Sequence, residues 1–106
     1  MNLIAFSIHD SAANAFVTPF FMHTKAMAMR AFEDNVNSKE ESNITKHPEQ
    51  FSLFKVGEFS DENGTLVALE KPEIIATGLE VLKPTEQTEI MAELQSLKSL
   101  LATKGE

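Results

Sequence analysis

The sequence contains no cysteine, no tryptophan and no tyrosine, and it has only four glycines and a single arginine. The absence of cysteine excludes disulfides and thiolate zinc sites, and it is typical of an intracellular protein. The glycines are scattered, so the chain has no phosphate-binding loop or dinucleotide motif. No apolar run is long enough to span a membrane, and the short apolar start lacks a basic leader. We therefore expect neither a membrane anchor nor a signal peptide.

Positive charge is scarce and unevenly distributed in a chain whose formal net charge is −7. Residues 1–32 carry Lys25 and Arg30 against Asp10, whereas the remaining residues carry seven lysines against fifteen carboxylates. Non-specific binding to duplex DNA depends on several cations that neutralise phosphates, so this balance argues against a duplex-coating protein. It favours protein partners, and it leaves room for a local nucleic-acid contact on the near-neutral N-terminal third.

No group of residues has the spacing of a catalytic or metal site. His9, Asp10 and Ser11 include the residue types of a serine-hydrolase triad, but three consecutive residues cannot place the base between nucleophile and carboxylate. The three histidines lie in separate segments without a second ligand at metal spacing. Neighbouring carboxylates such as Glu40 and Glu41 are typical of a solvated face. We expect no enzymatic activity, no metal site and no cofactor.

The hydrophobic pattern predicts an α+β fold that begins with a strand and a helix. Leu3–Ile8 alternates with the period of a strand, and the turn-rich connection His9–Pro19 follows it. Thr24 is a suitable N-cap for a helix over Lys25–Val36. The polar stretch Asn37–Gln50 is expected to be a surface loop, and the residue before its proline should not be helical.

In the rest of the domain the sequence pattern predicts a β-hairpin. The strand Phe51–Phe59 turns through Asp61–Gly64 into a partner strand, Thr65–Leu69, which Pro72 should end. Residues 73–82 are interpreted as a short helix or an edge segment. Alternation along the first hairpin strand places Phe54 and Val56 on one side and Phe51, Leu53 and Phe59 on the other.

The resulting architecture is a β-α-β-β domain: a three-stranded sheet with one helix packed on one face. The first connection between strands should be a right-handed crossover. We divide the chain into a compact α+β domain, residues 1–82, and a C-terminal amphipathic helix, residues 83–106. Apolar residues on both sides of the central strand indicate that the second face is covered too, by the C-terminal helix or by a second subunit.

One segment combines aromatic rings with cations and is our candidate nucleic-acid contact. Its members are Phe20, Phe21, His23, Lys25 and Arg30. Aromatic rings beside cations can stack single-stranded bases. The alternative is that both phenylalanines seal the helix against the sheet, because aromatic side chains usually belong to the core.

The C-terminal helix carries a narrow apolar seam that is typical of a coiled coil. Its members, Ile90, Leu94, Leu97 and Leu101, recur at spacings of four, three and four residues. This spacing predicts self-association into a homo-oligomer. The alternative is docking on the chain's own sheet, with Met91 and Leu100 widening the apolar face.

Two groups of motifs resemble a known family. The first contains Asp10-Ser11, Pro19-Phe20-Phe21-Met22, Thr24-Lys25 and Arg30-Ala31-Phe32. The second contains Lys46-His47-Pro48-Glu49, Leu53-Phe54, Val56-Gly57-Glu58-Phe59 and Gly64. Over about the first 70 residues the chain resembles the small nonstructural protein of gokushoviruses, the tailless single-stranded-DNA phages of the Microviridae.

The resemblance implies an accessory protein of phage multiplication in the host cytoplasm. The family is described as DNA-binding and is assigned to single-stranded genome synthesis or packaging. The sequence departs from the family's aromatic pattern at Phe59, where a tyrosine is expected. Single-stranded DNA, viral replication proteins and capsid proteins are the partners that the resemblance implies. The alternative function is a protein-binding assembly factor or host modulator without nucleic-acid contact.

Overall fold

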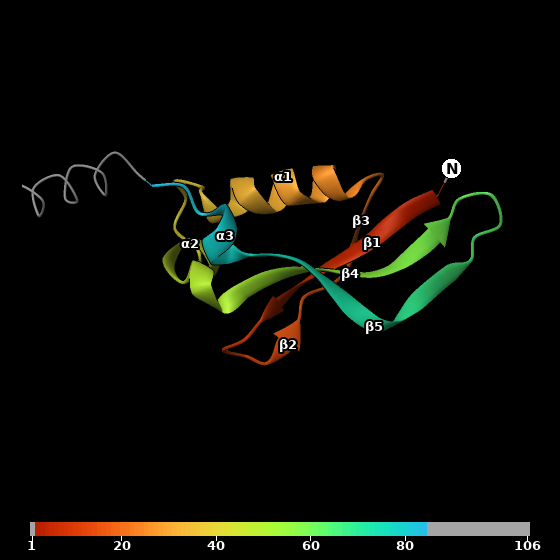
Figure 1. The fold of residues 1–106 in the computed structure, drawn as a ribbon, viewed down its shortest axis with the longest axis horizontal. Coiled ribbons are helices and arrows are strands. Elements are labelled where there is room, and N and C mark those ends of the chain that lie inside the picture. Colours follow the sequence, from red (N-terminus) through yellow and green to blue (C-terminus); the bar gives the residue numbers. More distant parts are fainter. Residues whose placement is uncertain (1, 85–106) are drawn as a thin grey trace, which may run out of the picture.

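The computed structural model describes residues 2–84, which form a curled antiparallel sheet with a helix packed against one face (Figure 1). Most of the sheet comes from three long strands, β1, β4 and β5, and the principal helix is α1. In chain order the elements are β1 (Asn2–Asp10), β2 (Ala15–Phe16), β3 (Phe20–Met22), α1 (Lys25–Val36), α2 (Asn43–Lys46), the 3₁₀ turn η1 (Pro48–Gln50), β4 (Phe51–Ser60), β5 (Leu66–Thr77) and α3 (Gly78–Val81).

The sheet has five strands, in the order β2-β1-β4-β5, and β3 also pairs with β1. Every pairing is antiparallel, including that between β1 and β4. The predicted right-handed crossover is therefore wrong, because the handedness rule applies only to parallel strands. The predicted count of three strands is also too low, since β2 and β3 are too short to show a hydrophobic period.

Helix α1 begins and ends where the sequence predicts. The Thr24 side chain accepts a hydrogen bond from the Met27 backbone N–H at 3.1 Å and so caps the first turn. Ala28, Phe32 and Val36, spaced four residues apart, are buried against the sheet. A spacing of four residues keeps side chains on one side of a helix. This stripe joins α1 to the sheet surface that we call the near face.

The core lies between α1 and the near face. Phe6, Phe32 and Leu53 are the largest fully buried side chains. Phe6 and Leu53 come from neighbouring strands, and Phe32 comes from the helix. Burying side chains of this size contributes about 1.5–3 kcal/mol each before conformational entropy is subtracted. The opposite surface of the sheet, the far face, carries no described helix (Figure 1).

A bulge in β4 changes which side chains share a face. Ala5 lies opposite Gly57, but Phe6 lies opposite Lys55, so Val56 is an extra residue on β4. The alternation restarts after this bulge, and Phe59 lies on the far face with Phe54. The prediction that Phe59 shares a face with Leu53 is therefore wrong, because strict alternation does not continue through a bulge.

A second irregularity carries β5 past Pro72. Lys55 lies opposite Glu73 and Gly57 lies opposite Ala68, so residues 69–72 oppose Val56 alone. Proline has no backbone N–H to donate, and it is tolerated where the ladder is interrupted. The prediction that Pro72 ends the strand is wrong. Residues 73–77 continue β5 and α3 follows, so both forms that the sequence suggested for 73–82 occur.

The connection from α1 to β4 is more ordered than the predicted loop. It contains α2, which a capping box of Ser42 and Thr45 begins, and then η1. His47, the residue before Pro48, has φ −133° and ψ 59° and is not helical, as predicted.

The end of the described chain is tied to the C-terminal end of α1. The Asn37 side chain donates to the Val81 carbonyl at 3.0 Å, and its oxygen accepts from the Lys83 backbone N–H at 2.8 Å. The predicted C-terminal helix, beyond its first two residues, lies outside the described residues, and so does its seam of Ile90, Leu94, Leu97 and Leu101.

Candidate binding face of the sheet

The far face gathers aromatic side chains from three strands. His9 and Phe16 are direct partners of β1 and β2, and their ring centroids lie 4.7 Å apart. Phe54 of β4 meets Phe16 at 5.3 Å and His9 at 6.2 Å, each near a right angle. Edge-to-face contacts of this kind stabilise aromatic pairs. Phe16 nevertheless remains 46 % exposed, so the cluster presents aromatic surface to the surroundings.

A second aromatic pair adjoins an apolar groove on the same face. Phe21 and Phe59 have ring centroids 5.9 Å apart, and Phe21 is 44 % exposed. Beside them lies a depression of about 210 Å³, lined by Ala5, Pro19, Phe21, Val56, Gly57, Leu66 and Ala68. None of these groove residues is charged or carries a polar side chain.

Gly57 allows the groove because β4 and β5 approach closely there. A Cβ atom at this position would lie 2.6 Å from the Val67 carbonyl oxygen and 3.3 Å from the Ala68 Cα. Both atoms belong to the backbone, so they cannot move without separating the strands. A side chain at position 57 would also fill the floor of the groove.

We name the combined surface the far-face patch. Its members share two properties: they lie on the sheet surface opposite α1, and none carries a formal charge when His9 is neutral. They are Ala5, His9, Phe16, Pro19, Phe21, Phe54, Val56, Phe59, Leu66, Ala68 and Ile74. In a chain of net charge −7, an uncharged surface with half-exposed aromatics is typical of an interaction site.

The structure separates the two aromatic residues of the predicted nucleic-acid contact. Phe20 packs against the core on the near face, where its ring stacks on Phe6 with centroids 5.9 Å apart. Phe21, the next residue of β3, lies on the far face. Successive residues of a strand point to opposite sides, so the two neighbours cannot share one binding surface.

Two of the three polar members of that contact, Lys25 and Arg30, belong to α1 on the near face. His23 is exposed between β3 and α1. The Lys25 ammonium pairs with the Glu73 carboxylate at 3.3 Å. Arg30 lies on α1 beside a polar depression of about 460 Å³. The five residues therefore do not form one surface, and their contact with nucleic acid remains a prediction.

The depression beside Arg30 also contains the shortest ion pair of the described residues. The Lys83 ammonium lies 2.7 Å from a Glu33 carboxylate oxygen. The hydrogen bond to Glu33, followed by the attraction of its charge, raises the pKa of Lys83. Arg30 thus lies among charges that already pair with one another, which makes this depression a poor phosphate site.

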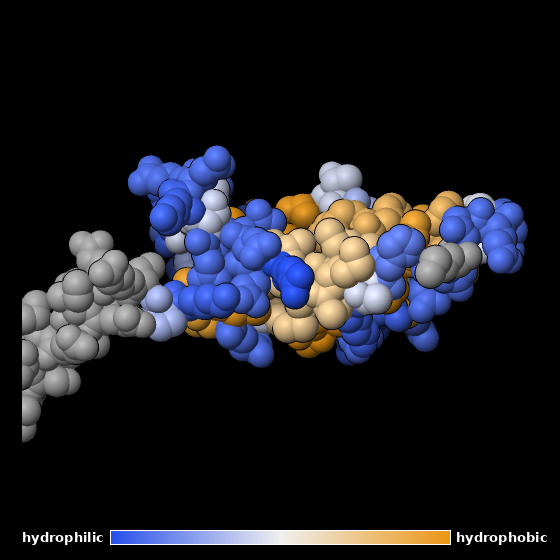
Figure 2. All heavy atoms as spheres, turned by 90° about the horizontal axis from the view of Figure 1, so that it is seen from above, coloured by the Kyte–Doolittle hydropathy of each residue, from blue (hydrophilic) through white to orange (hydrophobic). Residues whose placement is uncertain are grey.

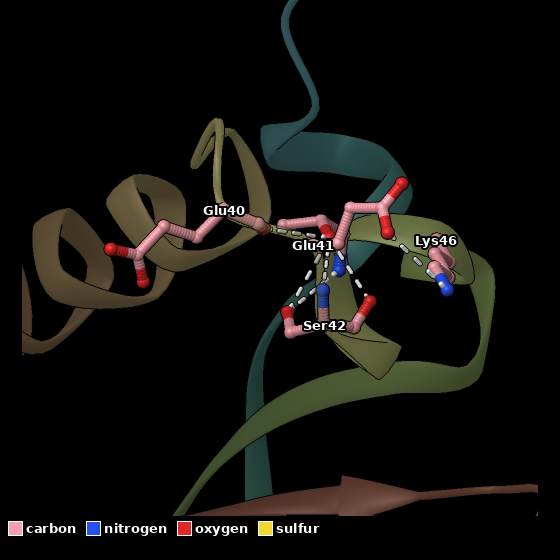
Figure 3. Close-up of polar contacts among 5 residues, drawn as sticks. Glu40, Glu41, Ser42 and Lys46 are labelled. Carbon is pink, nitrogen blue, oxygen red and sulfur yellow. Dashed lines mark hydrogen bonds and ion pairs between the residues drawn. The ribbon is translucent and has the colours of Figure 1, made fainter.

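The motifs that resembled catalytic groups have structural partners. The Asp10 carboxylate accepts hydrogen bonds from the backbone N–H groups of Ala12 and Ala13 at 3.0 and 3.4 Å, as turn chemistry requires. The Glu40 and Glu41 side chains point away from each other, and Glu41 faces Lys46 at 3.8 Å (Figure 3). The two carboxylates therefore do not form an acid–base pair.

Within residues 2–84 no three histidine, aspartate or glutamate side chains gather in a way that would hold a metal ion. None of the helices in this part of the chain combines the length and apolar character needed to cross a membrane.

The comparisons with known proteins place the chain in a phage family. Residues 3–81 match the family described as Phage ORF5 protein. The chain belongs to the phage ORF5 protein family. No curated protein and no solved structure matches it. The ORF5 match covers the sheet except for its first residue, together with α1 and α3, and therefore includes the far-face patch. It supports the phage origin that the sequence indicated.

The sequence did not single out Phe16, Phe54 or Phe59 as members of one site. Each is apolar and lies in or near a strand, which is equally typical of a core residue. The available signal was the presence of apolar residues on both sides of β4, which indicated a second covered face. Only strand pairing shows that Phe16 and Phe54 lie together.

Proposed function

We propose that this ORF5 protein is a non-enzymatic accessory factor of a gokushovirus that assists single-stranded DNA genome synthesis or packaging, acting as an oligomer. We propose further that it contacts single-stranded DNA through the far-face patch. The observation that carries this proposal is the presence of two phenylalanine pairs, Phe16 with Phe54 and Phe21 with Phe59, on one face of an antiparallel sheet. Sheets that bind single strands use exposed aromatic rings in this way, because every base can stack on them.

The charges of the molecule define what kind of DNA binding to expect. The patch offers aromatic rings on which bases can stack, but it contains no lysine or arginine. Lys25 forms an ion pair with Glu73. Binding should therefore be modest, dominated by stacking, and only weakly dependent on salt, since few phosphates are neutralised. Sequence preference should be slight.

Fluorescence anisotropy with labelled oligothymidine, at several salt concentrations, tests the proposal. Phe21→Ala should weaken binding about tenfold, because loss of one stacked base costs about 1–3 kcal/mol. Met27→Ala is the matched control: Met27 is 49 % exposed, but it lies on α1. That side of the molecule also shows apolar surface (Figure 2). Absence of binding at low salt, or equal losses in both variants, would contradict the proposal.

A second function has support from the groove itself. A depression with an entirely apolar lining, in an acidic chain, suits a protein partner better than a phosphate backbone. The alternative is thus an assembly factor or host modulator that binds replication or capsid proteins without nucleic-acid contact. If anisotropy shows no DNA binding, while a purified viral replication or capsid protein binds wild type and loses affinity for Phe21→Ala, this alternative replaces the first.

A further inference from the structure

The outer edge of β5 is open in the described part of the chain. The sheet order ends at β5, which pairs with β4 on one side and with no other strand of residues 2–84. An open edge presents backbone N–H and C=O groups that can pair with another chain. Natural sheets usually protect such edges with charges, proline or bulges.

The two halves of β5 differ in this protection. Glu70, Lys71 and Pro72 lie in the irregular stretch at the middle of the strand, and Glu73 follows. They supply all three protective devices. Residues 66–69, Leu-Val-Ala-Leu, run from the hairpin turn to the first residue of the bulge and contain no charge and no proline. This half of the edge is unprotected.

Leu66 and Val67 show which direction a partner must approach from. They are 61 % and 64 % exposed, the highest values among the large hydrophobic side chains of residues 2–84. Leu66 pairs with Phe59 on the far face, and Val67, the next residue, points to the near face. A partner stacked on one face of the sheet would cover only one of them. A strand added along the edge would contact both.

We propose that the occupant is a second copy of this chain, whose β5 edge pairs antiparallel with that of the first, so that Val67 of each copy lies opposite Val67 of the other. Two chains of net charge −7 repel each other, so a contact between copies requires an uncharged surface on both sides. Residues 66–69 meet this requirement and complement themselves about a two-fold axis. The same direction of pairing carries Lys71 of each copy toward the acidic turn at 61–64 of the other.

The arrangement has a consequence for the far-face patch. In an antiparallel strand pair, opposed side chains lie on the same side of the sheet. The two-fold axis therefore passes through the sheet, and both far-face patches lie on one side of a continuous sheet. The second copy would extend the apolar surface next to Leu66 without altering the patch within either copy.

Crosslinking tests this contact in the full-length protein, because the chain has no native cysteine. Val67→Cys and Met27→Cys each create one exposed thiol, on the β5 edge and on α1. A short bis-maleimide should link Val67→Cys into a covalent dimer several-fold more than Met27→Cys. Equal or absent crosslinking at Val67 would overturn the proposal, including the case in which residues 85–106 cover the edge.

Light scattering supplies the second measurement. Val67→Lys places a charge on the unprotected edge and should remove the dimer, whereas Met27→Lys should leave the mass unchanged. Circular dichroism shows whether both variants fold, as their exposure leads us to expect. A Val67→Lys protein that folds and keeps the wild-type mass would contradict the proposal. None of these readouts involves DNA, so the result is separate from that of the DNA-binding test.

Discussion

At the scale of single residues, the far-face patch depends on positions whose roles cannot be recognised from the residue type alone. Phe20 and Phe21 are identical neighbours in the sequence, yet one ring is packed against Phe6 and the other is presented on the far face. Ser7 is the only buried polar residue of the described core, and its hydroxyl donates to the Val17 carbonyl at 2.7 Å. Such roles depend on the side of the sheet to which each side chain points, and the residue type does not determine that side.

Gly57 provides a prediction at this scale. Gly57→Ala would place a methyl group 2.6 Å from the Val67 carbonyl oxygen, so β4 and β5 must move apart. We expect a loss of about 1–3 kcal/mol in the free energy of unfolding, measured by urea denaturation.

Gly64→Asn is the matched control for this substitution. Gly64 has φ +72° with open space around it, and asparagine tolerates that conformation. The control should therefore unfold close to the wild-type midpoint. If both variants are equally stable, the close approach at Gly57 does not matter to the fold.

At the scale of elements, predictability followed length and regularity. Helix α1 could be predicted with its cap and its bounds because twelve residues repeat a helical pattern. The hairpin was also predictable from Asn63 and Gly64. Strands β2 and β3 were missed because two or three residues carry no period. The length of β5 was missed because proline usually ends a strand, whereas Pro72 lies in a bulge, where proline is tolerated.

The N-cap of α1 gives the prediction for this scale. Thr24→Ala removes the hydroxyl that accepts from the Met27 N–H at 3.1 Å and should cost about 1 kcal/mol in the free energy of unfolding. Thr24→Ser keeps the hydroxyl and should cost far less. Thermal denaturation, followed by the circular-dichroism signal of helix, compares the stability of the two variants. An Ala variant as stable as the Ser variant would refute the assignment of the cap.

At the scale of the whole molecule, the chain has two separate candidates for self-association. One is the unprotected half of β5, which the structure describes. The other is the seam of Ile90, Leu94, Leu97 and Leu101, which rests on sequence periodicity and lies outside the described residues. The far-face patch adds a third apolar surface for another partner. An acidic chain keeps these surfaces from associating at random, since net charge opposes non-specific contact.

Removal of the seam distinguishes the two modes of association. If the seam associates, a chain ending at Pro84 should contain fewer copies per particle than the full chain, as light scattering gives from the particle mass divided by the mass of one chain, and the full chain with Leu94→Lys should show the same loss of copies. The same number of copies per particle in all three proteins would contradict a role of the seam.

The sequence by itself determined an acidic, cysteine-free α+β domain, the position of α1, the hairpin and the presence of apolar residues on both sides of β4. These properties are local, because they depend on composition and on periods within one segment. Only the tertiary structure decided the antiparallel sheet order, the bulges at Val56 and Pro72, the separation of Phe20 from Phe21 and the assembly of Phe16, Phe54 and Phe59 on one face. These properties depend on pairing between segments far apart in the chain, and such pairing leaves no pattern in either segment alone.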